Sequence, residues 1–236
     1  MPTELLFRDD AYRTSCDAKI LEVNERGGIV LDRTVFYATG GGQPGDKGEL
    51  VLASGGRIPI ATTVYGEDKA TVVHVPAEGA PLPAPGDAVT ATIDWEVRFA
   101  RMRVHTALHL LTTVLPYPVT GGAIGDGEGR LDFDIPDAIE KEAVTAALSQ
   151  AIAAHADVSA RWITDAELEA NPGLVKTMSV KPPMGSGRVR LVEIAGLDLQ
   201  PCGGTHVRNT REIGTVQVTG IEKKGKLNRR VRIALA

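Results

Sequence analysis

Cysteine is scarce in this sequence, with only Cys16 and Cys202 among 236 residues. Two cysteines cannot form the multiple disulfides that hold small secreted domains together. The first residues, MPTELLFRDD, lack the basic and apolar pattern of a secretory signal, and no run of about 18 apolar residues could span a membrane. We therefore expect a soluble cytoplasmic protein, in which a cysteine is a free thiol or a metal ligand.

An excess of positive charge is also missing. The 26 Lys and Arg residues against 30 Asp and Glu residues give a net charge of −4, so only a local basic patch could attract nucleic acid. Hydrophobic residues make up 43% of the chain, which excludes a mainly disordered protein. Glycine and proline are frequent, at 26 and 14 residues, and this indicates many turns and much β-structure.

The first part of the chain reads as short strands separated by turns. The segment Asn24–Gly27 lies between two apolar stretches and predicts a β-hairpin. Further strands are expected at residues 49–52, 57–64, 70–74 and 88–93. Strands at this spacing predict a small β-barrel or sandwich over residues 1–93.

Helical periodicity begins with the second part, residues 94–236. Asp94 can cap a helix predicted over Trp95–Leu115. A second helix is predicted over Pro136–Ala154, and Thr164–Glu167 fits the capping box of a short third helix. Alternating apolar residues then predict strands around 189–191, 216–218 and 231–235. The expected fold of this part is α+β, with helices packed on an antiparallel sheet.

Two short motifs carry the residues that could bind a metal ion. His105 and His109 stand four positions apart in the predicted helix, which puts both imidazoles on one face, although ordinary surface or core histidines also show this spacing. Downstream, Pro201–His206 (PCGGTH) can present a thiolate and an imidazole from one tight turn. Together the motifs supply nitrogen and sulfur donors that Zn²⁺ prefers. Thr106 stands where HExxH zinc peptidases have a general-base glutamate, so that class is disfavoured.

A glycine-rich segment, FYATGGGQPGDKG, occupies residues 36–48 of the first part. The consecutive glycines Gly40–Gly42 would allow the backbone to approach a ligand closely and to expose its N–H groups. The segment lacks the GxxxxGK[ST] pattern of a phosphate-binding loop. The simpler interpretation is a long turn that joins two barrel strands, and the spacing alone leaves both open.

Basic residues gather in two places. The C-terminal stretch 223–232 contains no acidic residue. Its basic residues are Lys223, Lys224, Lys226, Arg229, Arg230 and Arg232. Arg98, Arg101 and Arg103 share the predicted helix with the two histidines. Either group could contact phosphates or form an ordinary solvated surface. Cys16, His74 and His155 are expected to have structural roles.

These motifs, taken in order, resemble the editing domain of alanyl-tRNA synthetase. The matching stretches are FYATGGGQPGDKG at 36–48, RVHTALHLL at 103–111, GRLDFDI at 129–135 and QPCGGTHV at 200–207. The likeness extends over nearly the whole chain. It is strongest to the free-standing AlaX trans-editing proteins, and the glycine motif places the chain with the medium-length type of that family.

The resemblance implies an aminoacyl-tRNA deacylase that acts on the acceptor end of mischarged tRNA(Ala), not on DNA or at a membrane. Ser-tRNA(Ala) is the implied substrate, with Gly-tRNA(Ala) as a second candidate. The implied fold is a translation-factor-like β-barrel, residues 1–93, followed by an editing domain of the threonyl/alanyl-tRNA synthetase type, residues 94–236. Carried over residue by residue, the ligands of one Zn²⁺ are His105, His109, Cys202 and His206. The resemblance also implies that residues 120–123 form a loop that shapes the amino-acid pocket.

Other candidate contacts follow from side-chain chemistry and, for the glycines, from the accessible backbone. Those for the substrate are Thr39, Gly40, Gly41, Gly42, Gln43 and Thr106. Those for the RNA backbone are Lys224, Lys226 and Arg229, with Arg101 and Arg103 as alternatives. No catalytic residue beyond the metal site is predicted. Two other interpretations stay open: a zinc-stabilised tRNA-binding module without catalysis, and a hydrolytic Gly-Gly-Gln tripeptide like that of peptide release factors.

Overall fold

The structure is a computed structural model that describes residues 2–178, 187–225 and 227–236. The chain divides into two compact units, Met1–Phe99 and Ala100–Ala236, and the division falls inside helix α1 (Trp95–Val114). The expected domain boundary just before Asp94 stays a prediction. Among the described helices, none combines the length and the apolar character that crossing a lipid bilayer requires.

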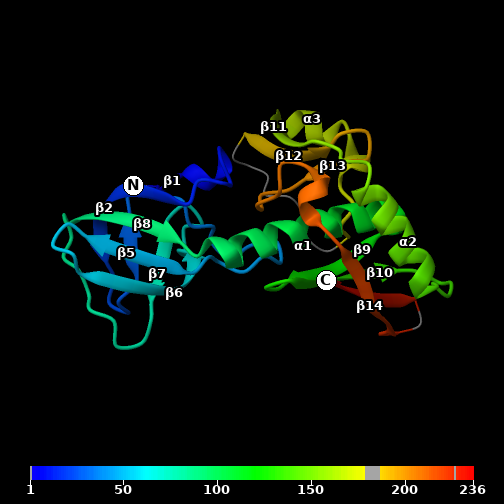
Figure 1. Cartoon of the computed structure of the whole chain (residues 1–236). Coiled ribbons are helices and arrows are strands. Elements are labelled where there is room, and N and C mark those ends of the chain that lie inside the picture. The colour runs from blue at the N-terminus through cyan, green and yellow to red at the C-terminus, as the bar shows by residue number, and fades with distance from the viewer. Residues whose placement is uncertain (1, 179–186, 226) are drawn as a thin grey trace. The chain divides into compact units, whose positions relative to one another are not determined.

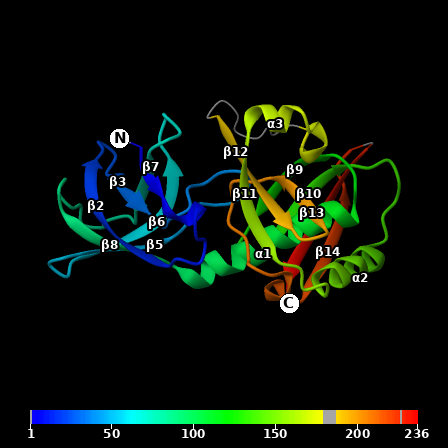
Figure 2. The same cartoon turned by 90° about the horizontal axis from the view of Figure 1, so that it is seen from above.

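The first unit contains a closed antiparallel β-barrel. Its strands follow the order β2-β3-β7-β6-β5-β8, and β8 pairs back with β2. They are β2 (Ser15–Val23), β3 (Ile29–Leu31), β5 (Gly48–Leu52), β6 (Arg57–Tyr65), β7 (Val72–Pro76) and β8 (Ala88–Ile93). Figures 1 and 2 show these strands curving around one core. Closure pairs both edges of the sheet, and the barrel prediction is confirmed. Near the N-terminus, β1 (Glu4–Leu5) pairs with β4 (Arg33–Thr34), and η1 (Leu6–Arg8) is a 3₁₀ turn.

Alternation along β2 explains why this segment is a barrel strand. Cys16, Ala18 and Ile20 are buried, while the residues between them are exposed. The predicted hairpin follows, and β2 pairs with β3 across it. Gly27 has φ 78° in the turn, a backbone conformation that glycine adopts without steric cost.

Two titratable groups buried in the barrel have the structural roles expected of them. Burial raises the pKa of the Cys16 thiol, which keeps it protonated and unreactive. The His74 ring lies 2.8 Å from Thr34 Oγ1 and 3.0 Å from the Ile29 carbonyl oxygen. Burial lowers the pKa of His74 to about 4, so the ring is neutral at physiological pH.

The second unit packs helices on two antiparallel sheets with strand orders β14-β15-β10-β9 and β11-β12-β13. The strands are β9 (Val119–Ile124), β10 (Glu128–Asp134), β11 (Val158–Thr164), β12 (Arg188–Ile194), β13 (Asp198–Pro201), β14 (Val216–Lys223) and β15 (Asn228–Leu235). The other helices are α2 (Lys141–Ile152) and α3 (Asp165–Glu169), with 3₁₀ turns η2 (Pro172–Leu174) and η3 (Thr210–Ile213). Figure 1 shows α3 beside β11 and β12. The α+β prediction is confirmed.

Local sequence signals set the beginning of α1 and its packing. The Asp94 carboxylate accepts a hydrogen bond of 3.2 Å from the Val97 N–H, which confirms the predicted N-cap. A side chain at Gly129 of β10 would place its Cβ 2.6 Å from a methyl carbon of Val104. Glycine at this position therefore lets α1 lie close against the larger sheet. The capping box predicted at Thr164 and Glu167 is also present.

Two expectations for this unit are wrong. Helix α2 begins at Lys141 rather than Pro136, because the chain stays extended after β10: the Ile135 N–H donates to the Leu227 carbonyl over 2.7 Å, and the Ile135 side chain is buried. Residues 120–123 form part of strand β9 rather than a loop, and Gly122 pairs with Leu131 of β10. Pairing with a neighbour thus overrides the weak strand propensity of glycine.

A buried ion pair in the first unit joins the glycine-rich segment to the start of α1. The Arg98 guanidinium donates to both carboxylate oxygens of Asp46, and to the carbonyl oxygens of Val35 and Ala11. Asp46 also accepts a 2.6 Å hydrogen bond from the Tyr37 N–H. Arg98 is fully buried, so its guanidinium offers no surface to a phosphate.

Loss of this pair should destabilise the protein strongly. We expect Asp46→Asn to lower the free energy of unfolding by about 3–5 kcal/mol, because it leaves the Arg98 charge buried without its counter-ion. Glu49→Gln is the matched control, since it removes an ion pair with Arg57 in which the two side chains are 33% and 68% exposed; it should cost less than about 1 kcal/mol. Urea denaturation measures both, and equal losses would contradict a stabilising role for the buried pair.

Candidate metal centre

Helix α1 presents two histidines from one face. His105 and His109 are both buried, and their ring centroids lie 5.1 Å apart. Buried apolar residues next to this face, including Val104, Leu108 and Leu111, anchor the helix. The predicted i, i+4 presentation is therefore confirmed.

The second pair of side chains comes from the turn that follows β13. The pairing of β13 with β12 continues to Cys202, whose N–H donates to the Arg190 carbonyl over 3.0 Å. The Arg190 guanidinium returns hydrogen bonds to the carbonyls of Cys202 and Gly204, at 2.9 and 3.1 Å. The Gly204 N–H lies 3.4 Å from Cys202 Sγ. These bonds hold the turn so that Cys202 and His206 face the same point.

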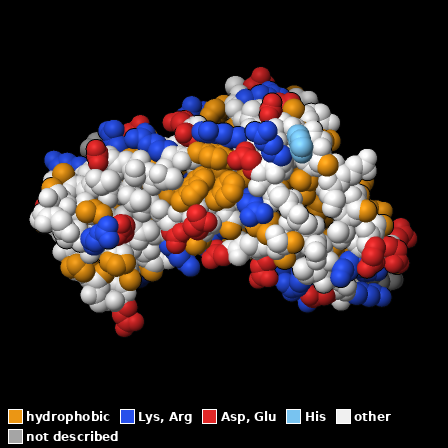
Figure 3. Space-filling view, viewed as in Figure 1, with side chains coloured by type: hydrophobic (Ala, Val, Ile, Leu, Met, Phe, Trp, Pro, Cys, Tyr) orange, Lys and Arg blue, Asp and Glu red, His pale blue; other side chains and the backbone are white. Residues whose placement is uncertain are grey.

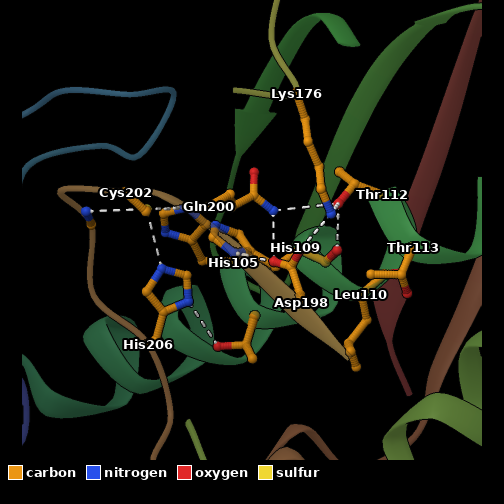
Figure 4. A network of polar contacts seen from close by, with 12 residues as sticks. His105, His109, Leu110, Thr112, Thr113, Lys176, Asp198, Gln200, Cys202 and His206 are labelled. Atoms are coloured by element: carbon orange, nitrogen blue, oxygen red, sulfur yellow. Dashed lines mark hydrogen bonds and ion pairs between the residues drawn. The ribbon is translucent and has the colours of Figure 1, made fainter. Parts of the chain in front are cut away.

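The four side chains converge on that point, as Figure 4 shows. One potential ligand atom from each of His105, His109, Cys202 and His206 lies within 4.8 Å of the other three. Cys202 Sγ is 3.5 Å from His105 Nε2 and 3.2 Å from His206 Nε2. Tetrahedral coordination by nitrogen and sulfur at usual bond lengths separates ligand atoms by about 3.3–3.6 Å. The cluster could therefore hold a metal ion.

Electrostatics prepare the cluster for a cation. Burial would raise the pKa of the Cys202 thiol, but interactions with His105 and His206 lower it well below its usual value. Burial and the neighbouring His105 lower the pKa of His206. Burial would also lower the pKa of His109, but hydrogen bonds with Asp198 and Cys202 raise it to about 9. These interactions favour loss of the Cys202 proton, whereas His109 holds a proton that a metal ion must displace.

Two of the histidines have identifiable partners on the nitrogen that faces away from the cluster. His109 Nδ1 lies 3.1 Å from Asp198 Oδ2, and His206 Nδ1 lies 3.1 Å from Thr106 Oγ1. The Thr106 hydroxyl also donates to the Met102 carbonyl and accepts from the Val207 N–H, and its side chain is fully buried. Thr106 thus orients His206, and a direct contact between Thr106 and a substrate stays a prediction.

Sequence reasoning missed the network around Asp198. Asp198 and Gln200 of β13 and Cys202 directly after it stand two residues apart. In an extended strand this spacing puts all three side chains on the same side. The spacing is therefore a signal that the sequence offers. Lys176 and Thr112 complete the network. Lys176 follows η2 in an irregular segment, where no periodicity marks it.

The glycine-rich segment belongs to the first unit and forms a tight turn. The backbones of Gly40 and Gln43 exchange two hydrogen bonds, of 3.1 and 2.9 Å. Gly41 and Gly42 between them have φ 56° and 83°, and a Cβ at Gly41 would meet no atom within 4 Å. The Thr39 hydroxyl donates to the Thr63 carbonyl. The roles of Thr39 and Gly40–Gln43 in binding a substrate stay predictions.

The buried position of Gln43 argues against the hydrolytic Gly-Gly-Gln tripeptide. Its side chain is 1% exposed, so the Gly-Gly-Gln tripeptide does not offer its amide to solvent in this structure. A hydrolytic tripeptide of the release-factor kind needs an accessible glutamine, and that interpretation is therefore disfavoured.

The arginines of α1 in the second unit are largely engaged in protein contacts. The Arg101 side chain is 3% exposed and donates to Asp126 over 2.7 Å. Arg103 donates to the carbonyl of Ile213 over 2.8 Å. These contacts leave little guanidinium surface for phosphate at Arg101, and contact of either residue with RNA stays a prediction.

The C-terminal basic residues are more accessible, although acidic groups accompany them. Lys224 is 42% exposed and lies 2.8 Å from Glu222, and Arg229 donates to the Pro136 carbonyl. Lys226 lies outside the described residues. On the face seen in Figure 3, described Lys and Arg side chains lie beside Asp and Glu side chains in several places. RNA contact by this group stays a prediction.

Matches to two family models define the class of protein: an α+β chain with domains of the aminoacyl-tRNA synthetase editing type. Residues 10–97 match the family described as tRNA synthetases class II (A). Residues 189–232, which include Cys202 and His206, match the family described as threonyl and alanyl tRNA synthetase second additional domain.

Full-length relatives narrow the class. Alanyl-tRNA editing protein AlaX-M of Methanosarcina mazei is 32% identical over 243 residues, which cover 99% of this chain and 96% of the relative. AlaX-M of Saccharolobus solfataricus is 32% identical over 237 residues, 97% of each. Alanine–tRNA ligase of Pyrobaculum arsenaticum is 34% identical over 94% of this chain, but over 25% of its own length. The chain belongs to the AlaX family of alanyl-tRNA editing proteins.

Metal affinity should depend on pH through His109. Because the pKa of His109 is raised to about 9 in the metal-free protein, a metal ion must displace its proton below that pH. We therefore expect the affinity for Zn²⁺, used as the probe ion, to weaken about tenfold for each pH unit between 9 and 7. Competition with a chelating indicator measures it, and a dissociation constant that is constant over this range would contradict the raised pKa.

Proposed function

We propose that this protein is a trans-editing aminoacyl-tRNA deacylase of the cytoplasm that hydrolyses mischarged tRNA(Ala). Ser-tRNA(Ala) is the proposed main substrate, and Gly-tRNA(Ala) is the second candidate. The observation that carries the proposal is the convergence of His105, His109, Cys202 and His206, in a chain that matches alanyl-tRNA editing proteins over 99% of its length. The amino acid would leave through hydrolysis of its ester bond to the terminal ribose.

Zn²⁺ is the proposed occupant of the cluster. Imidazole nitrogens and thiolates are donors that Zn²⁺ prefers, and the separations of 3.2 and 3.5 Å from Cys202 Sγ fit tetrahedral coordination. When bound, zinc would supply Lewis-acid polarisation for the ester carbonyl or a ligand position for the amino group. Cys202 is the only one of the four residues that is not buried, so we infer that the substrate reaches the cluster from the Cys202 side.

The remaining proposed contacts are those expected from the sequence. Thr39 and the backbone of Gly40–Gln43 would contact the aminoacyl end, with Gly41 and Gly42 exposing backbone N–H groups through their positive φ. Thr106 is the proposed contact within the second unit and is already placed beside His206. The residues proposed to hold the RNA backbone are Lys224, Lys226, Arg229, Arg101 and Arg103.

One observation favours a second candidate function. Zinc sites with four protein ligands are usually structural and closed, and the cluster offers four. A zinc-stabilised tRNA-binding module would need no open position on the metal. This alternative predicts tRNA binding without any loss of the attached amino acid.

Deacylation assays decide between these functions. We expect Ser-tRNA(Ala) to be hydrolysed about 100-fold or more faster than Ala-tRNA(Ala), because a site that binds a hydroxyl rejects the analogue lacking it. Cys202→Ala should lose this activity together with its metal, as measured by elemental analysis. Cys16→Ala is the matched control, since its thiol is buried in the barrel, and it should retain both.

Each other outcome has a distinct meaning. Equal rates on serine and alanine esters would contradict editing. Tight binding of tRNA with no hydrolysis of any ester would favour the non-catalytic module.

The glycine turn should matter for activity beyond its effect on stability. Gly41→Ala places a methyl group at φ 56°, which should cost about 1 kcal/mol of stability, and we expect deacylation to fall at least about tenfold because the methyl obstructs the aminoacyl end. Gly55→Ala is the matched control, with φ 87° and no atom within 4 Å of its Cβ. It should lose similar stability and keep wild-type turnover. Equal turnover in both variants would return the glycine turn to a purely structural role.

A further inference from the structure

His109 is held by a carboxylate on the side that faces away from the cluster. Its Nδ1 lies 3.1 Å from Asp198 Oδ2, and the two side chains are 8% and 0% exposed. A carboxylate accepts a hydrogen bond from a ring nitrogen that carries a proton. In the neutral ring, the bond therefore favours the tautomer with the proton on Nδ1, which leaves the Nε2 lone pair to bind a metal ion.

Asp198 is itself fixed from several directions, as Figure 4 shows. Gln200 Nε2 donates to Asp198 Oδ2 over 2.7 Å, and the Lys176 ammonium donates to Asp198 Oδ1. Both donors also reach Thr112 Oγ1, over 3.3 and 3.2 Å. Thr112 in turn donates to the His109 carbonyl over 2.7 Å, which closes the network on the helix that carries the ligand.

The partner of His206 is different in kind. Because the Thr106 hydroxyl donates to the Met102 carbonyl, it accepts the proton of His206 Nδ1. A hydroxyl carries no net charge, whereas Asp198 brings a negative charge to the proton it accepts. Asp198 therefore adds to the donor strength of His109 in a way that Thr106 cannot match for His206.

We propose that Asp198 is a positioning residue for the metal, which holds His109 in the ligating tautomer and strengthens it as a donor, while Lys176, Gln200 and Thr112 hold Asp198. This inference rests on the metal site of the proposed function. A partner of this kind typically changes metal affinity 10- to 100-fold. The carboxylate itself does not enter the coordination shell, and the Lys176 charge compensates its burial.

The test compares Zn²⁺ binding of wild type and Asp198→Asn by competition with a chelating indicator. We expect about 10- to 100-fold weaker binding in the variant, and a changed visible spectrum when Co²⁺ replaces zinc. The matched control is Asp132→Asn, because Asp132 is a largely buried carboxylate of the same unit that accepts from Arg130 and Arg230. Its zinc affinity and cobalt spectrum should be those of wild type, whatever its loss of stability. Zinc affinity and cobalt spectrum unchanged in Asp198→Asn would overturn the inference.

A second measurement uses the wild-type protein and does not depend on whether an Asp198 variant folds. In zinc-loaded wild type, ¹⁵N spectra of the histidine rings should show His109 with a protonated Nδ1 and a metal-bound Nε2, assigned by their disappearance in His109→Gln. A metal-bound or unprotonated Nδ1 would overturn the inference. Neither readout uses tRNA, so an absence of deacylation would leave the inference standing, whereas a wild-type protein that takes up no zinc would overturn both.

Discussion

Buried imidazoles need a partner for each ring nitrogen, and this requirement organises the second unit. Three histidine rings share one small space, with centroids 4.2–5.1 Å apart. Their inner nitrogens face a common point, so outer partners must come from the surrounding elements. Helix α1 supplies Thr106 for His206, and strand β13 supplies Asp198 for His109. The hydrogen bonds of the histidine rings thus hold helix α1 and strand β13 together at the site.

The elements that could be predicted are those in which local pattern and tertiary packing agree. Helix α1 has a capping residue and an apolar stripe, and β2 alternates strictly. Strand β9 was misjudged because its glycine pair has no strand preference of its own and depends on pairing with β10. The start of α2 was misjudged because Pro136 suits a helix N-terminus, while the backbone of Ile135 is committed to Leu227. In both cases a contact distant in sequence decides the conformation.

The proposed metal ligands could likewise be predicted from local sequence, whereas most of the residues that hold them in place could not. His105, His109, Cys202 and His206 could be found from spacing, since each pair lies within one local element. Asp198 and Gln200 left a weaker trace, in their alternation with Cys202 along β13. Lys176 and Thr112 left none, because their roles exist only where the segment after η2 meets the end of α1. For the basic residues, the sequence offers more candidates than the structure leaves available. Arg98 is a possible phosphate contact by sequence, yet it is the buried partner of Asp46.

Within strand β13, the site should tolerate substitutions better than insertions or deletions. Asp198, Gln200 and Cys202 face one side of the strand, while Leu199 packs with Val189 and Leu191 on the other. A substitution at one of these positions removes one function. Insertion or deletion of a single residue between Asp198 and Cys202 would instead reverse one end of the strand relative to the other, and would separate the thiolate from the carboxylate that supports its neighbouring ligand. Length variation in a lineage that retains this site should therefore accumulate in the connections around β13, and not within the strand.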